Sequence, residues 1–287
     1  MKVQKKPSVR RQKIRKNHSK ARLIVFLLMA AALLLAAVFA EHICPYDPNA
    51  QDTSISLHPP SLAHPAGTDQ FGRDMLSRII MGLQTSILST LTLVVIITVV
   101  GPIVGILSGF YGEILDAVVM RVSDVCLAFP GLVFALAIAA LLNGGLYNAV
   151  FALAVISWPK YARISRSQTL AQKSTNYIAA ARLAGNHSLQ IIIKHILPNS
   201  VGPILVTAML DIGTMLMELA GLSFLGLGAQ PPTAELGNMM SGGRSMLQTY
   251  PWVVLGPGIA IFVVVVVFNL LGDTVRDYLD PRNSSRQ

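Results

Sequence analysis

Six long apolar stretches alternate with polar segments along this chain. An apolar run of about 20 residues is long enough to cross the hydrocarbon core of a membrane as an α-helix. Each stretch therefore predicts a membrane-spanning helix, and we expect an all-α, polytopic membrane protein with six transmembrane helices. The stretches are 23–40, 85–110, 119–142, 147–163, 200–220 and 252–271.

The first stretch follows a basic segment and ends at the small residue Ala40, a pattern that cleaved signal peptides share. Its 18 residues are long for the apolar part of a signal peptide and adequate for a span, so we expect a retained helix. The third stretch contains Pro130, which predicts a kink. The fourth is the weakest, because Lys160 and Arg163 crowd its end.

The basic residues fall on one side of the predicted membrane. If the N-terminus is inside, the inner segments hold 20 of the 23 Lys and Arg, ten of them in residues 1–22. The positive-inside rule then places both termini in the cytoplasm. The expected organisation is a basic cytoplasmic tail (1–22), a first helix (23–40), an extracytoplasmic segment (41–84), a five-helix core (85–271) with a cytoplasmic loop at 174–199, and a cytoplasmic tail (272–287).

The composition agrees with a membrane protein. Apolar residues make up 53% of the chain and charged residues 13%, against roughly 25% charged in soluble domains. The net charge of +9 reflects the basic N-terminal tail, which lacks interleaved aromatic residues. We therefore expect this tail to anchor the chain at the lipid headgroups and to bind no nucleic acid. Cys44 and Cys126 fall outside the membrane and in a span, so no disulfide is predicted.

The sequence contains none of the signatures that we would associate with catalysis. No G-x-x-x-x-G-K-[ST] occurs, so the chain has no P-loop for ATP. Neither H-E-x-x-H nor a His–Asp–Ser order in a dry site is present, and we predict no catalytic residues. A fixed metal site needs three or four converging ligands, whereas the six histidines are scattered. We expect neither a metal site nor a cofactor.

Residues 177–199, YIAAARLAGNHSLQIIIKHILPN, predict two short helices in the cytoplasmic loop. Ser174 or Thr175 can cap the first helix, and Gly185 can adopt the left-handed conformation that ends it. Pro198 is expected to stop the second helix. The apolar face of that helix consists of Ile191, Ile192 and Ile196. Such a loop serves either as an amphipathic connector on the inner surface of the bundle or as a docking element for a soluble partner.

This loop resembles the cytoplasmic EAA loop of ABC importer membrane subunits. That pattern runs E-A-A, three residues, Gly, about nine residues, and then an apolar residue followed by L-P. Ala180 and Ala181 match the two alanines, Gly185 the glycine, and Pro198 the final proline. Ala179 stands where the pattern has its glutamate, so this chain departs from the pattern at its acidic position.

Four further motifs resemble the second permease of dipeptide, oligopeptide and nickel importers, and they extend from about residue 45 to residue 281. They are GTDQFGRDMLSR at 67–78, MRVSDVCLAFP at 120–130, LSFLGLGAQPPTAELG at 222–237 and FNLLGDTVRDYLDP at 268–281. The order of the four motifs, together with the loop, makes the resemblance specific.

The resemblance implies a type I permease in a prokaryotic inner membrane, forming half of a pore with a sister permease. Two cytoplasmic ATPases would power it, and an extracytoplasmic binding protein would deliver the solute. In that family the loop docks into a cleft on an ATPase. The residues that the resemblance assigns to this coupling are Tyr177, Ala180, Ala181, Gly185, Asn186, Ser188 and Pro198.

The fifth stretch carries Asp211, Met215 and Glu218, whose spacings of four and three place them on one helix face. Charges within a span cost on the order of 2.5–3.5 kcal/mol, so each needs a reason to be there. One interpretation is a pore-lining stripe that meets peptide amino groups or a metal-bearing solute. The other places Glu218 at the outer water interface and pairs Asp211 with a neighbouring helix.

Other charged residues also admit two interpretations. Arg121 and Asp124, three apart, are predicted to pair with each other at the inner start of the third span. The outer segment 67–82 is either a gate or docking patch, or a lead-in to the second span whose charges satisfy one another. Those charges are Asp69, Arg73, Asp74 and Arg78.

The most specific function that these features predict is the permease subunit of an ABC importer of short peptides. Nickel or a metal chelate is the alternative solute, because LDIGTM at 210–215 is similar to nickel-type permeases. Those relatives place histidines on this span, whereas Thr214 and Glu218 stand there here. A secondary transporter without an ATPase would be favoured by an inverted repeat, and we find no clear one.

Overall fold

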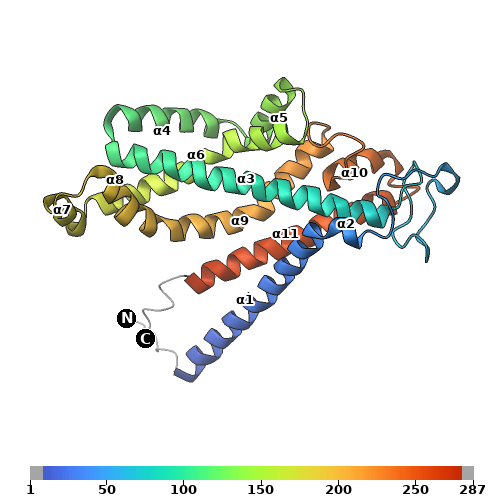
Figure 1. Cartoon of the computed structure of the whole chain (residues 1–287), viewed down its shortest axis with the longest axis horizontal. Coiled ribbons are helices and arrows are strands. Elements are labelled where there is room, and N and C mark those ends of the chain that lie inside the picture. The colour runs from blue at the N-terminus through green and yellow to red at the C-terminus, as the bar shows by residue number, and fades with distance from the viewer. Residues whose placement is uncertain (1–8, 280–287) are drawn as a thin grey trace, which may run out of the picture.

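The computed structural model describes residues 9–279, which form a bundle of long helices joined by short helices and turns (Figure 1). The long helices are α1 (Val9–Val38), α3 (Met75–Tyr111), α6 (Leu146–Lys173), α9 (Leu197–Phe224) and α11 (Trp252–Leu279). The shorter ones are α2 (Ala40–Ile43), α4 (Glu113–Ala128), α5 (Gly131–Leu141), α7 (Asn176–Leu183), α8 (Ser188–Ile191) and α10 (Leu236–Gly243). Within this range no strand occurs, which confirms the all-α prediction.

Each of the six predicted stretches contains helix. Over the described residues, four helical segments are long and apolar enough to cross a membrane, and the bent pair α4–α5 makes up to a fifth. The four are Lys20–Val38, Met75–Tyr111, Ser188–Phe224 and Trp252–Tyr278. Helix α6 covers the remaining predicted stretch and continues to Lys173, so its basic half extends well beyond the apolar part.

The third predicted span is not one straight helix. Helix α4 ends at Ala128, and α5 begins at Gly131 at an angle of 97° to it. Pro130 lies in the break, where its missing N–H and fixed φ interrupt the helical hydrogen bonds. The kink that this proline predicts is therefore a near-perpendicular turn, visible in Figure 1 where α5 leaves the direction of α4.

Helices α3 and α6 lie side by side along most of their length, and two glycines of α3 allow this close approach (Figure 1). A Cβ added at Gly101 would lie 2.6 Å from the Cβ of Tyr161. A Cβ added at Gly105 would lie 2.1 Å from the main-chain oxygen of Ala162. Small residues of this kind bring membrane helices into backbone contact, because apolar burial alone gives little preference within lipid.

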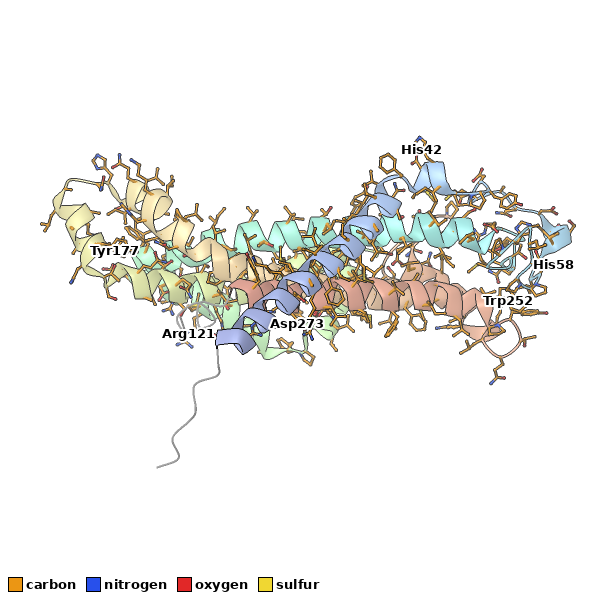
Figure 2. The ribbon with its side chains drawn as sticks, turned by 90° about the horizontal axis from the view of Figure 1, so that it is seen from below. His42, His58, Arg121, Tyr177, Trp252 and Asp273 are labelled. Carbon is orange, nitrogen blue, oxygen red and sulfur yellow. The ribbon has the colours of Figure 1, made fainter. Side chains whose placement is uncertain are left out.

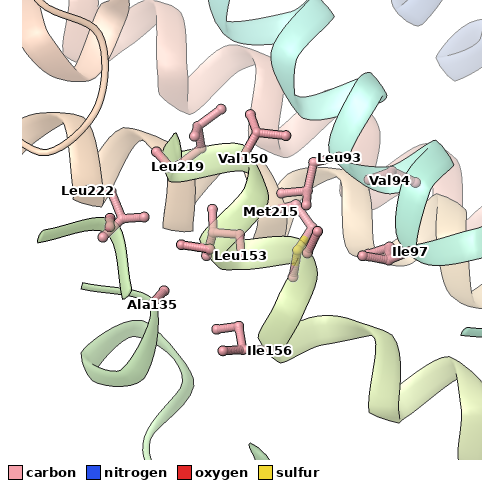
Figure 3. Packing of buried hydrophobic residues seen from close by; sticks show 14 of the residues in the cluster. Leu93, Val94, Ile97, Ala135, Val150, Leu153, Ile156, Met215, Leu219 and Leu222 are labelled. Atoms are coloured by element: carbon pink, nitrogen blue, oxygen red, sulfur yellow. The ribbon is translucent and has the colours of Figure 1, made fainter. Parts of the chain in front are cut away.

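Two apolar clusters hold the bundle together. One joins α3, α5, α6 and α9, and Figure 3 shows Leu93, Leu153, Met215 and Leu219 converging in it. The other joins α1, α3, α9, α10 and α11. Ala30 and Ala37 of α1 are buried in this second cluster, so the first predicted helix packs as part of the fold.

The two ends of the bundle differ in content. Helices α7 and α8 lie at one end, toward which the start of α1 and the end of α11 also point (Figure 1). Helices α2 and α10 lie at the opposite end, and Figure 2 places His58 and Trp252 there, far from Tyr177. The described ends of the chain thus share one side of the bundle with the loop at 174–199.

Candidate functional site

The loop at 174–199, which we call the coupling loop, folds as a compact helical hairpin. Helix α7 ends at Leu183 with Ala184 as its C-cap, and Gly185 turns the chain with a φ of +83°. Positive φ is strained for other residues and open to glycine, which is why the chain reverses here. The N–H of Asn186 then donates to the oxygen of Ala181 at 3.1 Å, and α8 starts at Ser188.

Apolar side chains fix this hairpin to the bundle. Ile178 of α7 is fully buried. It packs with Ile106 and Phe110 at the end of α3. The other members of this cluster are Ile191, Ile192 and Ile196, which confirms the predicted apolar face. The loop is therefore attached to α3 as well as to the two helices that it connects.

The opposite face of the hairpin presents apolar side chains to the outside. Leu183 is 90% exposed at the end of α7, and Leu189 is 63% exposed on α8. Tyr177 is exposed too, and its hydroxyl lies 3.2 Å from Gln172 Oε1. Exposed large apolar groups such as these are available for contact with another molecule.

The remaining predicted coupling residues fall on both faces of the hairpin. Ala180 is exposed and Ala181 is buried, so only one of the two alanines is free for a partner. Asn186 is half-buried at the turn, and Ser188 is exposed at the start of α8. The sequence pattern therefore mixes residues that shape the hairpin with residues that it displays.

Two local predictions in the loop were wrong. Thr175 stands at the N-cap of α7, but its hydroxyl donates to the oxygen of Gln172 at 2.5 Å and does not cap the helix. Pro198 does not stop a helix, because the chain passes from α8 through a π-helical turn, Ile192–Ile196, directly into α9. The wider turn relieves the clash between the proline ring and the carbonyl four residues earlier.

The charged residue of α9, Asp211, is buried against α6. Its two carboxylate oxygens lie 2.7 and 2.9 Å from Lys160 Nζ, and the Tyr161 hydroxyl donates to Oδ2 at 2.9 Å. The pairing of Asp211 with a neighbouring helix is thus observed. Met215, one turn on, is buried with its sulfur 3.8 Å from Ser157 Oγ. Glu218 is half-buried, and no side chain among residues 9–279 forms a hydrogen bond or ion pair with it.

The basic half of α6 pairs with α4 in a way that the sequence did not indicate. Asp124 accepts a 2.6 Å hydrogen bond from Arg163, so the predicted pair of Arg121 with Asp124 was wrong. Asp116 accepts both arms of Arg166, with distances of 2.5 Å. These contacts cross between helices, and spacing within one helix gives no signal for them.

The outer charged cluster is largely self-satisfied. Asp69 pairs with Arg73 at 2.7 Å and lies 3.7 Å from Arg78, while Asp74 caps α3 through the N–H of Ser77. Asp69, Arg73 and Arg78 line one wall of a cavity of about 180 Å³ beside α10. The pairing favours the lead-in interpretation of segment 67–82.

One buried acid was missed at the sequence level. Glu235 is fully buried and caps α10, accepting hydrogen bonds from the N–H groups of Gly237 and Asn238. It also accepts one from the Ser86 hydroxyl of α3 at 3.0 Å. Its position just before a helix start was the available signal, since acids are favoured there.

The comparison with known families decides what kind of protein this is. Residues 101–285 match the family described as "Binding-protein-dependent transport system inner membrane component". The chain belongs to this family. It is therefore a multi-pass membrane permease subunit of an ABC importer, without an ATPase site of its own, and the family works with separate ATPases and binding proteins.

Relatives extend the match to most of the chain. It is 43% identical over 255 residues to the probable D,D-dipeptide transport system permease protein DdpC of Escherichia coli, covering 89% of this chain and 86% of the relative. It is 38% identical over 265 residues to the dipeptide transport system permease protein DppC of Haemophilus influenzae, with coverages of 90% and 89%. The glutathione transport system permease protein GsiD of Pectobacterium atrosepticum is 42% identical over 259 residues, with coverages of 90% and 86%.

A solved structure supports the fold. A chain of the inward-facing MetNI methionine ABC transporter superposes with a TM-score of 0.57, covering 71% of this chain and 97% of that chain. The two sequences are 22% identical, so this likeness concerns the fold alone. It confirms the ABC type I permease fold that the sequence motifs predict.

Proposed function

We propose that this chain is one of two permease halves of an ATP-driven importer of short peptides, and that its coupling loop docks on a cytoplasmic ATPase. The observation that carries the docking is the two-faced hairpin. Its inner face packs on α3 through the cluster that contains Ile178, and Leu183 and Leu189 are exposed on the hairpin. A partner that covers the outer face would hold the bundle through the inner one.

The partners follow from what the chain provides and lacks. It supplies one bundle and no ATP site, so we infer a similar sister permease, two ATPases and an extracytoplasmic binding protein. The 20 basic residues on the side of the coupling loop favour a cytoplasmic position for both termini. The ATPases then meet the loop, and the binding protein meets the end that holds α2 and α10.

Mechanical continuity explains how the loop can act on the pathway. Residues Ser188–Phe224 form a helical segment of 37 residues that runs from the coupling loop through the level of Asp211. A helix rises about 1.5 Å per residue, so a tilt at the loop is carried along roughly 55 Å. We expect ATP-driven closure of the ATPases to move this segment and α3 together, and so to switch the side from which the pathway is open.

The names of the relatives favour short peptides as solutes. The three relatives described above are named for D,D-dipeptide, dipeptide and glutathione transport. Glutathione is a tripeptide, so all three names concern short peptides. Nickel, the alternative solute, has no comparable support among them.

The test is reconstitution of the complete importer. A pull-down of this chain in gentle detergent from its native membrane, followed by mass spectrometry, is expected to recover a second permease and P-loop ATPases. The recovered complex in vesicles, with its binding protein, should accumulate a labelled dipeptide only with ATP. Accumulation of nickel in its place, or of peptide by this chain alone without ATP, would overturn the proposal.

A further inference from the structure

A polar stripe runs along the middle of α9, and it adds Thr207 and Thr214 to the predicted residues Asp211 and Glu218. Thr207, Asp211, Thr214 and Glu218 follow one another at spacings of four, three and four, and so share one face of the helix. This stripe extends over about 16 Å at 1.5 Å per residue. Thr214 is exposed, and Thr207 and Glu218 are half-buried, so the stripe is partly open to the surroundings of the bundle.

Lys160 of α6 reaches this stripe from the side. Its ammonium group contacts both oxygens of Asp211 at 2.7 and 2.9 Å, yet its side chain remains 52% exposed, whereas that of Asp211 is 8% exposed. A lysine has three N–H donors, and Asp211 engages two of them. One donor of a fixed positive charge is therefore left facing outward at the level of the stripe.

Contact of such a charged group with lipid is energetically unfavourable. A charge exposed to the hydrocarbon core costs on the order of 2.5–3.5 kcal/mol. Glu218 adds a second charge, which forms no hydrogen bond or ion pair within the described residues and has Lys160 as its nearby opposite charge. The face that holds Lys160 and Glu218 must therefore adjoin water, a solute or a polar protein surface. A positive and a negative group on one open face are complementary to a molecule that carries both charges.

The spacing suits a short peptide. Asp211, which holds Lys160, and Glu218 are seven residues apart, or about 10 Å along the helix. The main chain of two residues extends about 7 Å, and a hydrogen bond adds about 2.8 Å at each end. These lengths add to about 13 Å, somewhat more than the axial spacing, and the difference is available for the sideways offset of Lys160, which lies on α6. A dipeptide can therefore bridge the two charged groups with its carboxylate toward Lys160 and its ammonium group toward Glu218.

The geometry points to Lys160, Asp211 and Glu218 as a bipolar solute site within the permease, selective for short peptides with free termini. Lys160 binds the carboxylate of the peptide, Asp211 positions Lys160, and Glu218 binds the ammonium group. This inference rests on the proposed import of peptides and adds that the membrane subunit itself recognises the two termini.

The test compares solutes in the reconstituted importer with its binding protein saturated. Uptake of labelled alanyl-alanine is measured beside uptake of its C-terminal amide, for the parent complex and for a Lys160→Met, Asp211→Asn double variant. The double variant removes both charges together and leaves Tyr161 an acceptor, so it avoids a buried unpaired carboxylate. The binding protein is the same in every assay, and changes in the ratio of the two uptake rates therefore belong to the permease.

We expect the free-acid to amide ratio of the double variant to fall about tenfold, chiefly through loss of free-acid uptake. As a matched control, an Arg163→Gln, Asp124→Asn variant removes another α6 ion pair and should keep the parent ratio. An unchanged ratio in the double variant would overturn the inference and leave a structural ion pair. Loss of the sister permease from the double-variant complex would also overturn it, by making Lys160 a subunit contact.

The two proposals fail in different ways. If the parent complex accumulates no peptide with ATP, the proposed function fails and the site falls with it. If the parent accumulates peptide and the double variant keeps its ratio, only the bipolar site is wrong.

Discussion

The ammonium group of Lys173 donates a 2.6 Å hydrogen bond to the main-chain carbonyl of Phe110. This contact joins the last turn of α6 to the last turn of α3, where helix carbonyls lack intrahelical donors. The Phe110 ring also lies 5.7 Å from Lys173 Nζ and 5.7 Å from the guanidinium carbon of Arg182 in α7. The coupling loop is thus fixed to α3 by polar contacts as well as by its isoleucines.

The isoleucine cluster predicts how firmly the loop is held. Ile196 is fully buried, so Ile196→Ala should cost about 2–5 kcal/mol of local packing. We expect the loop of this variant to open more often and trypsin to cut at Arg182 faster than in the parent chain. Ile193→Ala is the matched control, because Ile193 is exposed three residues away. Equal cutting rates for the two variants would contradict the attachment.

The turn at Gly185 requires a residue that can adopt a positive φ, but it does not require a small side chain. A Cβ at this position meets no atom within 4 Å, so a side chain has room, but the φ of +83° is unfavourable for residues other than glycine. Valine, which is β-branched, should suffer most, and asparagine tolerates this region best. We expect Gly185→Val to remain in the membrane while its ATPase recovery in a pull-down falls severalfold, and Gly185→Asn to retain most of it. Full recovery with Gly185→Val would refute the role of the turn.

The close packing of α3 against α6, which we call the α3–α6 seam, predicts that a larger residue at Gly105 lowers the stability of the protein. A methyl group at Gly105 would press against the Ala162 carbonyl, and such overpacking costs about 1–3 kcal/mol. Gly105→Ala should therefore lower the Tm of the detergent-solubilised protein by at least about 2 °C. Gly221→Ala serves as the control, since its Cβ would be 3.9 Å from Leu132 and the change favours the helix. A lower Tm for Gly221→Ala than for Gly105→Ala would contradict the close packing at the seam.

Features set by local sequence were the ones that could be predicted. Apolar length indicates where the helices lie, because a span must be about 20 residues whatever it packs against. The turn at Gly185 and the buried face of Ile191, Ile192 and Ile196 follow from conformational freedom and helical spacing in the same way. The turn and the buried face of the coupling loop could therefore be predicted from its own residues.

Features set by contacts between helices could not be predicted. Asp124 has Arg121 at a favourable spacing, yet it pairs with Arg163, because the packing of α4 on α6 brings the two together. In the sequence, Lys160 only weakens the prediction of the fourth span. Its ion pair with Asp211 becomes apparent only in the fold. The helix stop expected at Pro198 failed because a π-helical turn accommodates the proline.

Cross-linking from the tip of the coupling loop tests the central claim most directly. Cysteine in place of Leu183, in a chain whose Cys44 and Cys126 are replaced by alanine, carries a photoactivatable cross-linker in native membranes. Leu62, which is also fully exposed and lies at the opposite end, gives the matched control site. We predict an adduct with a P-loop ATPase from position 183 and none from position 62. Adducts from position 183 that contain no ATPase, while the importer is active, would contradict the account.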